Sequence, residues 1–174
     1  MKKIIMNSIL AVGILSLSGC VNDMPNKSEQ MGVSFADAKW GGMMVPKDQV
    51  CKWAGGDGST PSLKVTNLPL GTSKVLVLFS DDTYKPMDNG GHGQIGINVS
   101  NQTDIMIPSI KGETKVMPVN MFIHKEHKGL KRGKAGAYLP PCSGGKGNSY
   151  YATVKALNSN DEVLKTTEIQ MGKF

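Results

Sequence analysis

Short stretches in which apolar, often β-branched residues alternate with polar ones recur along most of the chain. They cover residues 63–68, 74–79, 94–99, 104–110, 116–123, 150–157 and 162–169. Clusters of Gly, Pro, Asn, Asp and Ser separate them, for example at 88–91, 143–148 and 158–161. Alternation with period two between such turn signals is typical of β-strands. The pattern predicts an all-β sandwich or barrel, with few short helical turns such as residues 135–139.

The first twenty residues, MKKIIMNSILAVGILSLSGC, have the parts of a bacterial export signal. A basic start and a short apolar region precede Leu17-Ser18-Gly19-Cys20, which matches the cleavage box of a lipoprotein. The apolar region is shorter than the roughly 20 residues that a permanent transmembrane helix needs. We therefore predict a lipoprotein signal peptide at 1–19. The alternative is an ordinary secretory signal with a chance cysteine.

Cleavage would make Cys20 the N-terminus, with acyl chains such as palmitate on its thiol and amine. Several acyl chains anchor a protein stably, whereas one is marginal. Residues 20–30 then serve as lipid anchor and tether, and residues 31–174 are long enough to form one domain with its own core. Because Val21 rather than Asp follows the cysteine, we expect a protein of the bacterial cell envelope, lipid-anchored at the outer membrane.

The positive charge of the exported chain is concentrated in one segment. After residue 19 the chain has 18 basic and 14 acidic residues, and the segment HKEHKGLKRGK at 124–134 alone carries +4. Its basic residues are Lys125, Lys128, Lys131, Arg132 and Lys134. No aromatic residues are interleaved with them, so a nucleic-acid partner is not expected. The segment is either a solvated loop or a contact for anionic lipid headgroups or an acidic partner.

The two cysteines that remain, Cys51 and Cys142, most simply form a disulfide in an oxidising compartment. There is no CxxC pair and no zinc-type spacing. Asp81, Asp82 and Asp88 miss the spacing of a calcium loop, and His124 and His127 have no third ligand nearby. No metal site and no cofactor are expected.

Three stretches match the order and spacing of motifs in a known family. They are VPKDQVCKWAGGDGSTPSL at 45–63, NLPLGTSKVLVLFSDD at 67–82 and YLPPCSGGKGNSYYATVKAL at 138–157. Together they resemble the phosphatidylethanolamine-binding protein family, in particular its bacterial Raf-kinase-inhibitor-like branch, over about residues 40–160. The resemblance implies a Greek-key β-sandwich with a small pocket for phosphate-type anions.

The resemblance places four residues of this chain in that pocket: Asp81, His92, Pro141 and Tyr150. Other positions differ. The family's second Asp is Thr83, its second His is Asn148, and the Trp after its first His is Gly93. The loss of one Asp and one His removes half of the polar groups that would hold an anion. We therefore expect weak binding of phosphate headgroups, with His92 as the one cation.

Two interpretations of Asp81 and His92 stay open. The two side chains and Tyr150 could converge on a ligand, and the carboxylate would then raise the pKa of the imidazole. Alternatively, Asp81 begins a turn and His92 packs near it. No serine or cysteine lies in a nucleophile motif with a placed base, so an enzyme is not expected.

The main functional hypothesis is a non-enzymatic interaction module in the envelope with an eroded pocket. Such a module would be an accessory component of a surface machine for secretion, conjugation, pilus assembly or adhesion, with an envelope protein as its partner. The alternative is a periplasmic binder of a small ligand or phosphate headgroup with a modified anion pocket. An interaction module should have its pocket filled by side chains and an exposed apolar patch elsewhere. A ligand binder should have an open pocket lined by Asp81, His92 and Tyr150.

Overall fold

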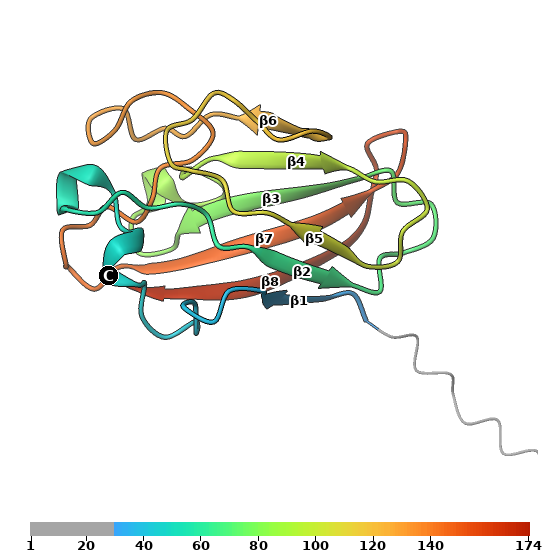
Figure 1. Cartoon of the computed structure of the whole chain (residues 1–174), viewed down its shortest axis with the longest axis horizontal. Coiled ribbons are helices and arrows are strands. Elements are labelled where there is room, and N and C mark those ends of the chain that lie inside the picture. The colour runs from blue at the N-terminus through green and yellow to red at the C-terminus, as the bar shows by residue number, and fades with distance from the viewer. Residues whose placement is uncertain (1–29) are drawn as a thin grey trace, which may run out of the picture.

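The computed structural model describes residues 30–174, which form two antiparallel β-sheets packed face to face (Figure 1). The predicted signal peptide, Cys20 and all of the tether except its last residue lie outside the described residues. No helix within the described part of the chain is long and apolar enough to cross a membrane.

The two sheets contain eight strands, and short 3-10 turns are the helical structure of the described chain. The strands are β1 (Gly32–Phe35), β2 (Leu63–Thr66), β3 (Lys74–Asp81), β4 (Gln94–Asn98), β5 (Ile105–Ile107), β6 (Met121–Lys125), β7 (Ser149–Leu157) and β8 (Val163–Lys173). The 3-10 turns are η1 (Lys47–Gln49), η2 (Lys52–Ala54) and η3 (Lys85–Met87). The prediction of an all-β fold with few short helical turns is confirmed.

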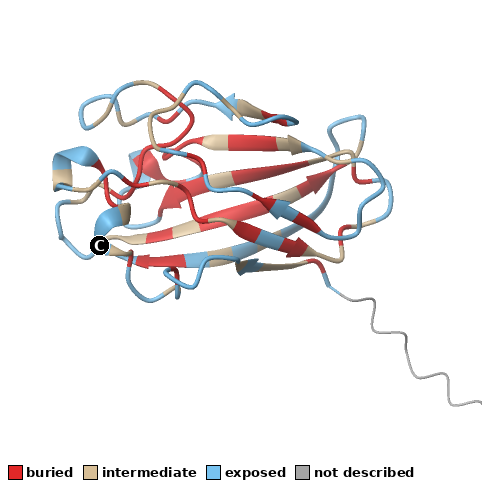
Figure 2. Ribbon diagram, viewed as in Figure 1, coloured by how far each residue is buried: buried red, intermediate tan, exposed pale blue. Residues whose placement is uncertain are grey.

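The smaller sheet has the order β1-β2-β5, and residues of β2 and β5 alternate between the core and solvent. Leu63 and Val65 of β2 are buried, whereas Lys64 between them is exposed. Ile105 and Ile107 of β5 follow the same pattern around Met106. Figure 2 shows this alternation of buried and exposed positions along β2 and β5. Burying one face of each strand is what the sequence alternation predicts.

The larger sheet has the order β6-β4-β3-β7-β8. Its two central strands, β3 and β7, are buried over most of their length, with Val77 opposite Val154 and Phe79 opposite Ala152. β3, β4 and β6 are neighbours, and β7 returns to lie beside β3, which is the order of a Greek key. The return from β6 to β7 spans residues 126–148 and contains most of the basic segment.

The loops that the resemblance singled out gather at one end of the sandwich. The segment around η2, the loop after β3 and the connection 126–148 all lie at the left in Figure 1, and the chain enters β1 at the opposite end. A disulfide joins Cys51 to Cys142 across this end, with 5.3 Å between their Cα atoms. The predicted pairing of the cysteines is therefore present, and it links η2 to the end of the 126–148 connection.

Several predicted boundaries are wrong. Residues 135–139 form no helical turn, because Leu139 pairs with His92 through its backbone N–H (2.9 Å) and Ala137 pairs with Thr114 (2.8 Å). The stretch 116–123 becomes strand only from Met121. Residues 118–121 form a turn, in which the carbonyl of Pro118 accepts the N–H of Met121 (3.0 Å). β1 was not predicted.

Candidate functional site

Strand register places Asp81 and Tyr150 side by side at one end of the core. They are directly opposite each other in the β3–β7 pair, two residues beyond the pair Phe79 and Ala152. Successive side chains of a strand alternate between its faces, so both point to the same side as the buried Phe79 and Ala152. They continue the row of core residues to the point where the sheets open.

His92 joins this pair from the other side of β3. Its backbone N–H donates to the carbonyl of Phe79 (3.0 Å), and the N–H of Phe79 donates to the carbonyl of Gly93 (3.0 Å). The imidazole packs edge to face on the ring of Tyr150, with centroids 5.3 Å apart. The structure thus brings together three of the four site residues that the resemblance named.

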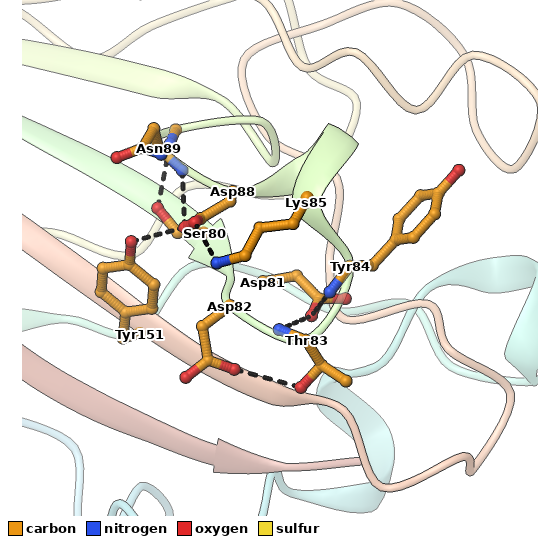
Figure 3. A network of polar contacts seen from close by, with 10 residues as sticks. Ser80, Asp81, Asp82, Thr83, Tyr84, Lys85, Asp88, Asn89 and Tyr151 are labelled. Carbon is orange, nitrogen blue, oxygen red and sulfur yellow. Dashed lines mark hydrogen bonds and ion pairs between the residues drawn. The ribbon is translucent and has the colours of Figure 1, made fainter.

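The Asp81 carboxylate accepts three hydrogen bonds from within the protein. One oxygen accepts the backbone N–H groups of Thr83 and Tyr84 (3.0 Å each), as Figure 3 shows, and the other accepts the amide of Asn148 (2.7 Å). Asp81 therefore begins a turn, as one of the two interpretations stated. Asn148 occupies the position of the family's second His and keeps a hydrogen bond to the carboxylate without supplying a charge.

A second polar network holds the loop after β3. Asp88 accepts the hydroxyl of Tyr151 (2.6 Å), the backbone N–H of Asn89 (2.8 Å) and the ammonium of Lys85 (3.2 Å), as Figure 3 shows. The Tyr151 hydroxyl, more than the other partners, holds the pKa of Asp88 below its usual range. Tyr151 points away from Tyr150 because the two are successive residues of β7.

His92 is a neutral hydrogen-bond acceptor toward the cavity. Its Nδ1 lies 2.7 Å from the carbonyl oxygen of Leu139, which can only accept, so the proton is on Nδ1 and Nε2 carries the lone pair. Burial lowers the pKa of His92 to about 4, because desolvation outweighs the Leu139 hydrogen bond and the Asp81 charge. Burial therefore opposes the effect of the Asp81 charge, on which the ligand-binding interpretation of a cationic His92 depended.

Tyr150 contributes a hydroxyl that stays protonated. Burial, and to a lesser extent the Asp81 charge, raises the pKa of this phenol. Its oxygen accepts the backbone N–H of Cys142 (3.2 Å). The hydroxyl proton is thus available to a ligand, beside the lone pair of His92.

These residues form the floor of a cavity of about 830 Å³, which is in the range of small-molecule sites. Its walls include the apolar residues Met87, Leu130 and Leu139. The full lining comprises Asp81, Thr83, Tyr84, Pro86, Met87, His92, Lys128, Gly129, Leu130, Lys131, Arg132, Leu139, Cys142, Ser143, Lys146, Asn148 and Tyr150. The cavity is therefore open, with polar side chains including Asp81 on its floor, apolar side chains in its walls and basic side chains around it.

Only some of the basic residues predicted at 124–134 reach the cavity. Lys128, Lys131 and Arg132 line the cavity, whereas Lys125 and Lys134 do not. Lys146, which lies outside the basic segment 124–134, adds a fourth basic side chain. The only sequence signal for Lys146 is its place in the Gly-rich loop next to Cys142.

Pro141 and Gly93 occupy pocket positions according to the family resemblance, but neither lines the cavity. Pro141 is buried, and its carbonyl accepts the backbone N–H of Cys51 (3.0 Å), but it does not line the cavity. Gly93 has a positive φ of 117°, and a side chain there would collide with the carbonyl of Ala137. The absence of the family's Trp at this position thus follows from the close approach of residues 137–139.

The described residues hold no group of three or more His, Cys, Asp or Glu side chains arranged to bind a metal ion. The chemistry available in the cavity is hydrogen bonding and charge attraction. The floor offers the acceptors His92 Nε2 and Asp81 and the donor Tyr150, and the basic side chains offer donors with positive charge.

The fold is that of phosphatidylethanolamine-binding proteins. YbcL of Escherichia coli, described as a new member of the mammalian PEBP family, is similar with a TM-score of 0.54 and 19% identity, over 83% of this chain and 98% of that chain. CT736 of Chlamydia trachomatis, described as a putative PEBP homolog, is similar with a TM-score of 0.51 and 18% identity, over 83% and 97%. No family model matches the sequence, and no curated protein matches it. The predicted resemblance is confirmed in the fold.

Proposed function

We propose that this protein binds a small phosphate-bearing molecule in the cavity formed by Asp81, His92, Tyr150 and the connection 126–148. The observation that carries this proposal is the open cavity of about 830 Å³ above those three side chains. An interaction module with an eroded pocket was expected to have that space filled. The geometry therefore favours the ligand-binding alternative over an accessory role in a surface machine.

The chemistry of the cavity supports a phosphate group and a polar remainder. Four basic side chains line it against one carboxylate, Asp81. Arg and Lys are the side chains that proteins use to hold phosphate oxygens. The names of the solved structures with this fold refer to phosphatidylethanolamine binding, which agrees with a phosphate-bearing ligand.

Titration calorimetry with phosphorylethanolamine at pH 7.5 tests the proposal. Tyr150→Phe removes one hydroxyl from the floor and keeps the ring, so we expect binding to weaken about tenfold. Tyr151→Phe is the matched control, because the neighbouring tyrosine bonds to Asp88 and does not line the cavity. No binding by the wild type, or an equal loss in both variants, would contradict the proposal.

We further propose that the protein works from the cell envelope, attached through acylated Cys20. The basis is the lipoprotein box at 17–20 and the disulfide between Cys51 and Cys142, a bond typical of exported proteins. The chain enters β1 at the end of the sandwich opposite the cavity loops (Figure 1). An anchor at that end would leave the cavity facing away from the membrane, where it could take a ligand from the periplasmic solution. We propose binding alone, without catalysis.

A further inference from the structure

The basic side chains that line the cavity lack acidic partners. Within the described residues Lys128, Lys131, Arg132 and Lys146 form no ion pair. Six other lysines do pair with a carboxylate: Lys39, Lys52, Lys74, Lys85, Lys111 and Lys115. Glu126, the acidic residue of the basic segment, pairs with Lys115 (3.5 Å) and not with the lining. The positive charge around the cavity is therefore uncompensated.

The loop that carries three of these charges is held by specific contacts. His127 is buried at its base, where Nε2 donates to the carbonyl of Lys134 (2.6 Å) and Nδ1 accepts the N–H of Gly129 (3.2 Å). The backbone N–H of Lys128 donates to the carbonyl of Gly91, one residue before His92 (2.8 Å). Residues 128–134 are thus closed into a loop that is tied to the floor of the cavity.

Arg132 is held by an aromatic residue outside the cavity lining. Its guanidinium lies 3.6 Å from the ring centroid of Trp53, a cation–π contact. Trp53 belongs to η2, and the disulfide joins Cys51, just before η2, to Cys142 in the cavity lining. The Arg132 charge is therefore positioned by packing, although the side chain is exposed.

The floor and the basic lining differ in polarity. On the floor, the neutral His92 accepts through Nε2 and the Asp81 carboxylate carries a negative charge, so an anion is not favoured there. Hydroxyl groups suit this floor, because they donate to such acceptors and accept from Tyr150. The anionic groups of a ligand are favoured at Lys128, Lys131, Arg132 and Lys146.

We infer that these four basic residues, which we call the rim, form a second subsite for anionic groups, and that the cavity takes a sugar carrying two phosphates. The inference rests on the proposed function and names its ligand class. The rim and Asp81 together give a lining charge of +3. A phosphate monoester carries about −1.5 to −2 at neutral pH, so two of them match that charge. The sugar hydroxyls then meet His92 and Tyr150.

Calorimetric titration with fructose 1,6-bisphosphate, fructose 6-phosphate and fructose tests the inference at pH 7.5 and low salt. We expect the bisphosphate to bind at least tenfold more tightly than the monophosphate. The double variant Lys131→Gln/Arg132→Gln should lose most of that difference, since each exposed charge contact contributes a few-fold. Lys125→Gln/Lys134→Gln removes two charges from the same segment outside the lining, and should change binding less than twofold.

Three results would overturn the rim subsite. Equal affinity for the monophosphate and the bisphosphate would leave the cavity as a binding site but remove the rim from it. An equal loss in the rim variant and its control would show diffuse attraction by the segment. Binding of the rim to vesicles of anionic phospholipid, with no binding of a soluble phosphate, would assign it to a membrane surface. If no probe binds and phosphorylethanolamine does not bind either, the proposed function itself fails.

Discussion

Asp81 of β3 lies directly opposite Tyr150 of β7, in register with the core pairs Val77–Val154 and Phe79–Ala152. The same row of inward side chains that fills the hydrophobic core therefore ends in two polar residues at the cavity floor. His92 is added by a backbone pairing with Phe79. The site is thus an extension of the sheet, and its geometry is set by strand register more than by loop conformation.

Replacing Asp81 should destabilise the protein, because its carboxylate accepts three hydrogen bonds from Thr83, Tyr84 and Asn148. We expect Asp81→Ala to lower the free energy of unfolding by roughly 2–3 kcal/mol. Asp82→Ala is the control, since Asp82 is exposed and accepts one bond from the Thr83 hydroxyl (3.1 Å). Urea denaturation of both variants checks this. Similar midpoints would mean that the Asp81 bonds contribute little.

The protein should lose stability as the pH falls from about 6.5 toward 4. His92 has a pKa of about 4 when folded and 6.5 as its model value, so in this window the unfolded state binds more protons. The loss from this group is roughly 3 kcal/mol and is complete below pH 4. Denaturant titrations at several pH values measure it. In His92→Asn this dependence should disappear, whereas in a variant of the exposed His124 it should persist.

Anion binding should, for the same reason, not tighten as the pH falls to 5.5. His92 remains neutral there, and the lysines and arginine of the rim are already charged. Titration of phosphorylethanolamine at pH 7.5 and 5.5 tests this. A marked increase in affinity that is lost in His92→Asn would show that the imidazole becomes a cation in the complex.

Tyr138 carries a buried hydroxyl without a hydrogen-bond partner among the described residues. Its ring packs edge to face on Phe79, with centroids 4.8 Å apart. Tyr138→Phe should keep this packing and leave the free energy of unfolding unchanged or raise it by up to about 1 kcal/mol. Tyr150→Phe should instead lower it by about 1 kcal/mol, because the N–H of Cys142 loses its acceptor. Thermal unfolding of the two variants distinguishes them.

The disulfide should stabilise the fold and the cavity wall together. It joins residues 91 apart in the sequence, and Cys51→Ala/Cys142→Ala should lower the free energy of unfolding by about 2–4 kcal/mol. Adding a reductant should lower the stability of the wild type and leave the double variant unaffected. Labelling of both thiols in unreduced, natively purified protein would show that the bond is absent in solution.

The lipid anchor is tested by Cys20→Ser. We expect this variant to lose acyl labelling and to accumulate as an unprocessed or soluble species, because the thiol is the acceptor of the first lipid. Mass spectrometry of the membrane-bound wild type should find a chain that begins at an acylated Cys20. An intact Met1 on that membrane-bound protein would contradict the prediction.

Much of the fold was predictable from local pattern. Strands β2 to β8 each fall on a predicted stretch, because alternation with period two reports which face of a strand is buried. β1 was missed because its sequence, GVSF, is only four residues and has no flanking turn cluster. β8 runs to Lys173, beyond the predicted 169, since an irregularity of register near Gly172 lets it continue along β7.

The sequence by itself determined strands β2 to β8, the partner cysteines and the floor residues Asp81, His92 and Tyr150. These depend on alternation along one strand, on the number of cysteines and on motifs in the resemblance. Only the tertiary structure decided that His92 is neutral, because burial of the imidazole lowers its pKa more than the Leu139 hydrogen bond and the Asp81 charge raise it. It also brought Lys146 beside Lys128, Lys131 and Arg132. These four residues belong to one connection, 126–148, but Lys146 is 14 residues from Arg132 in the sequence. The two ends of the connection line one cavity only in the folded chain, and no local pattern records that distance.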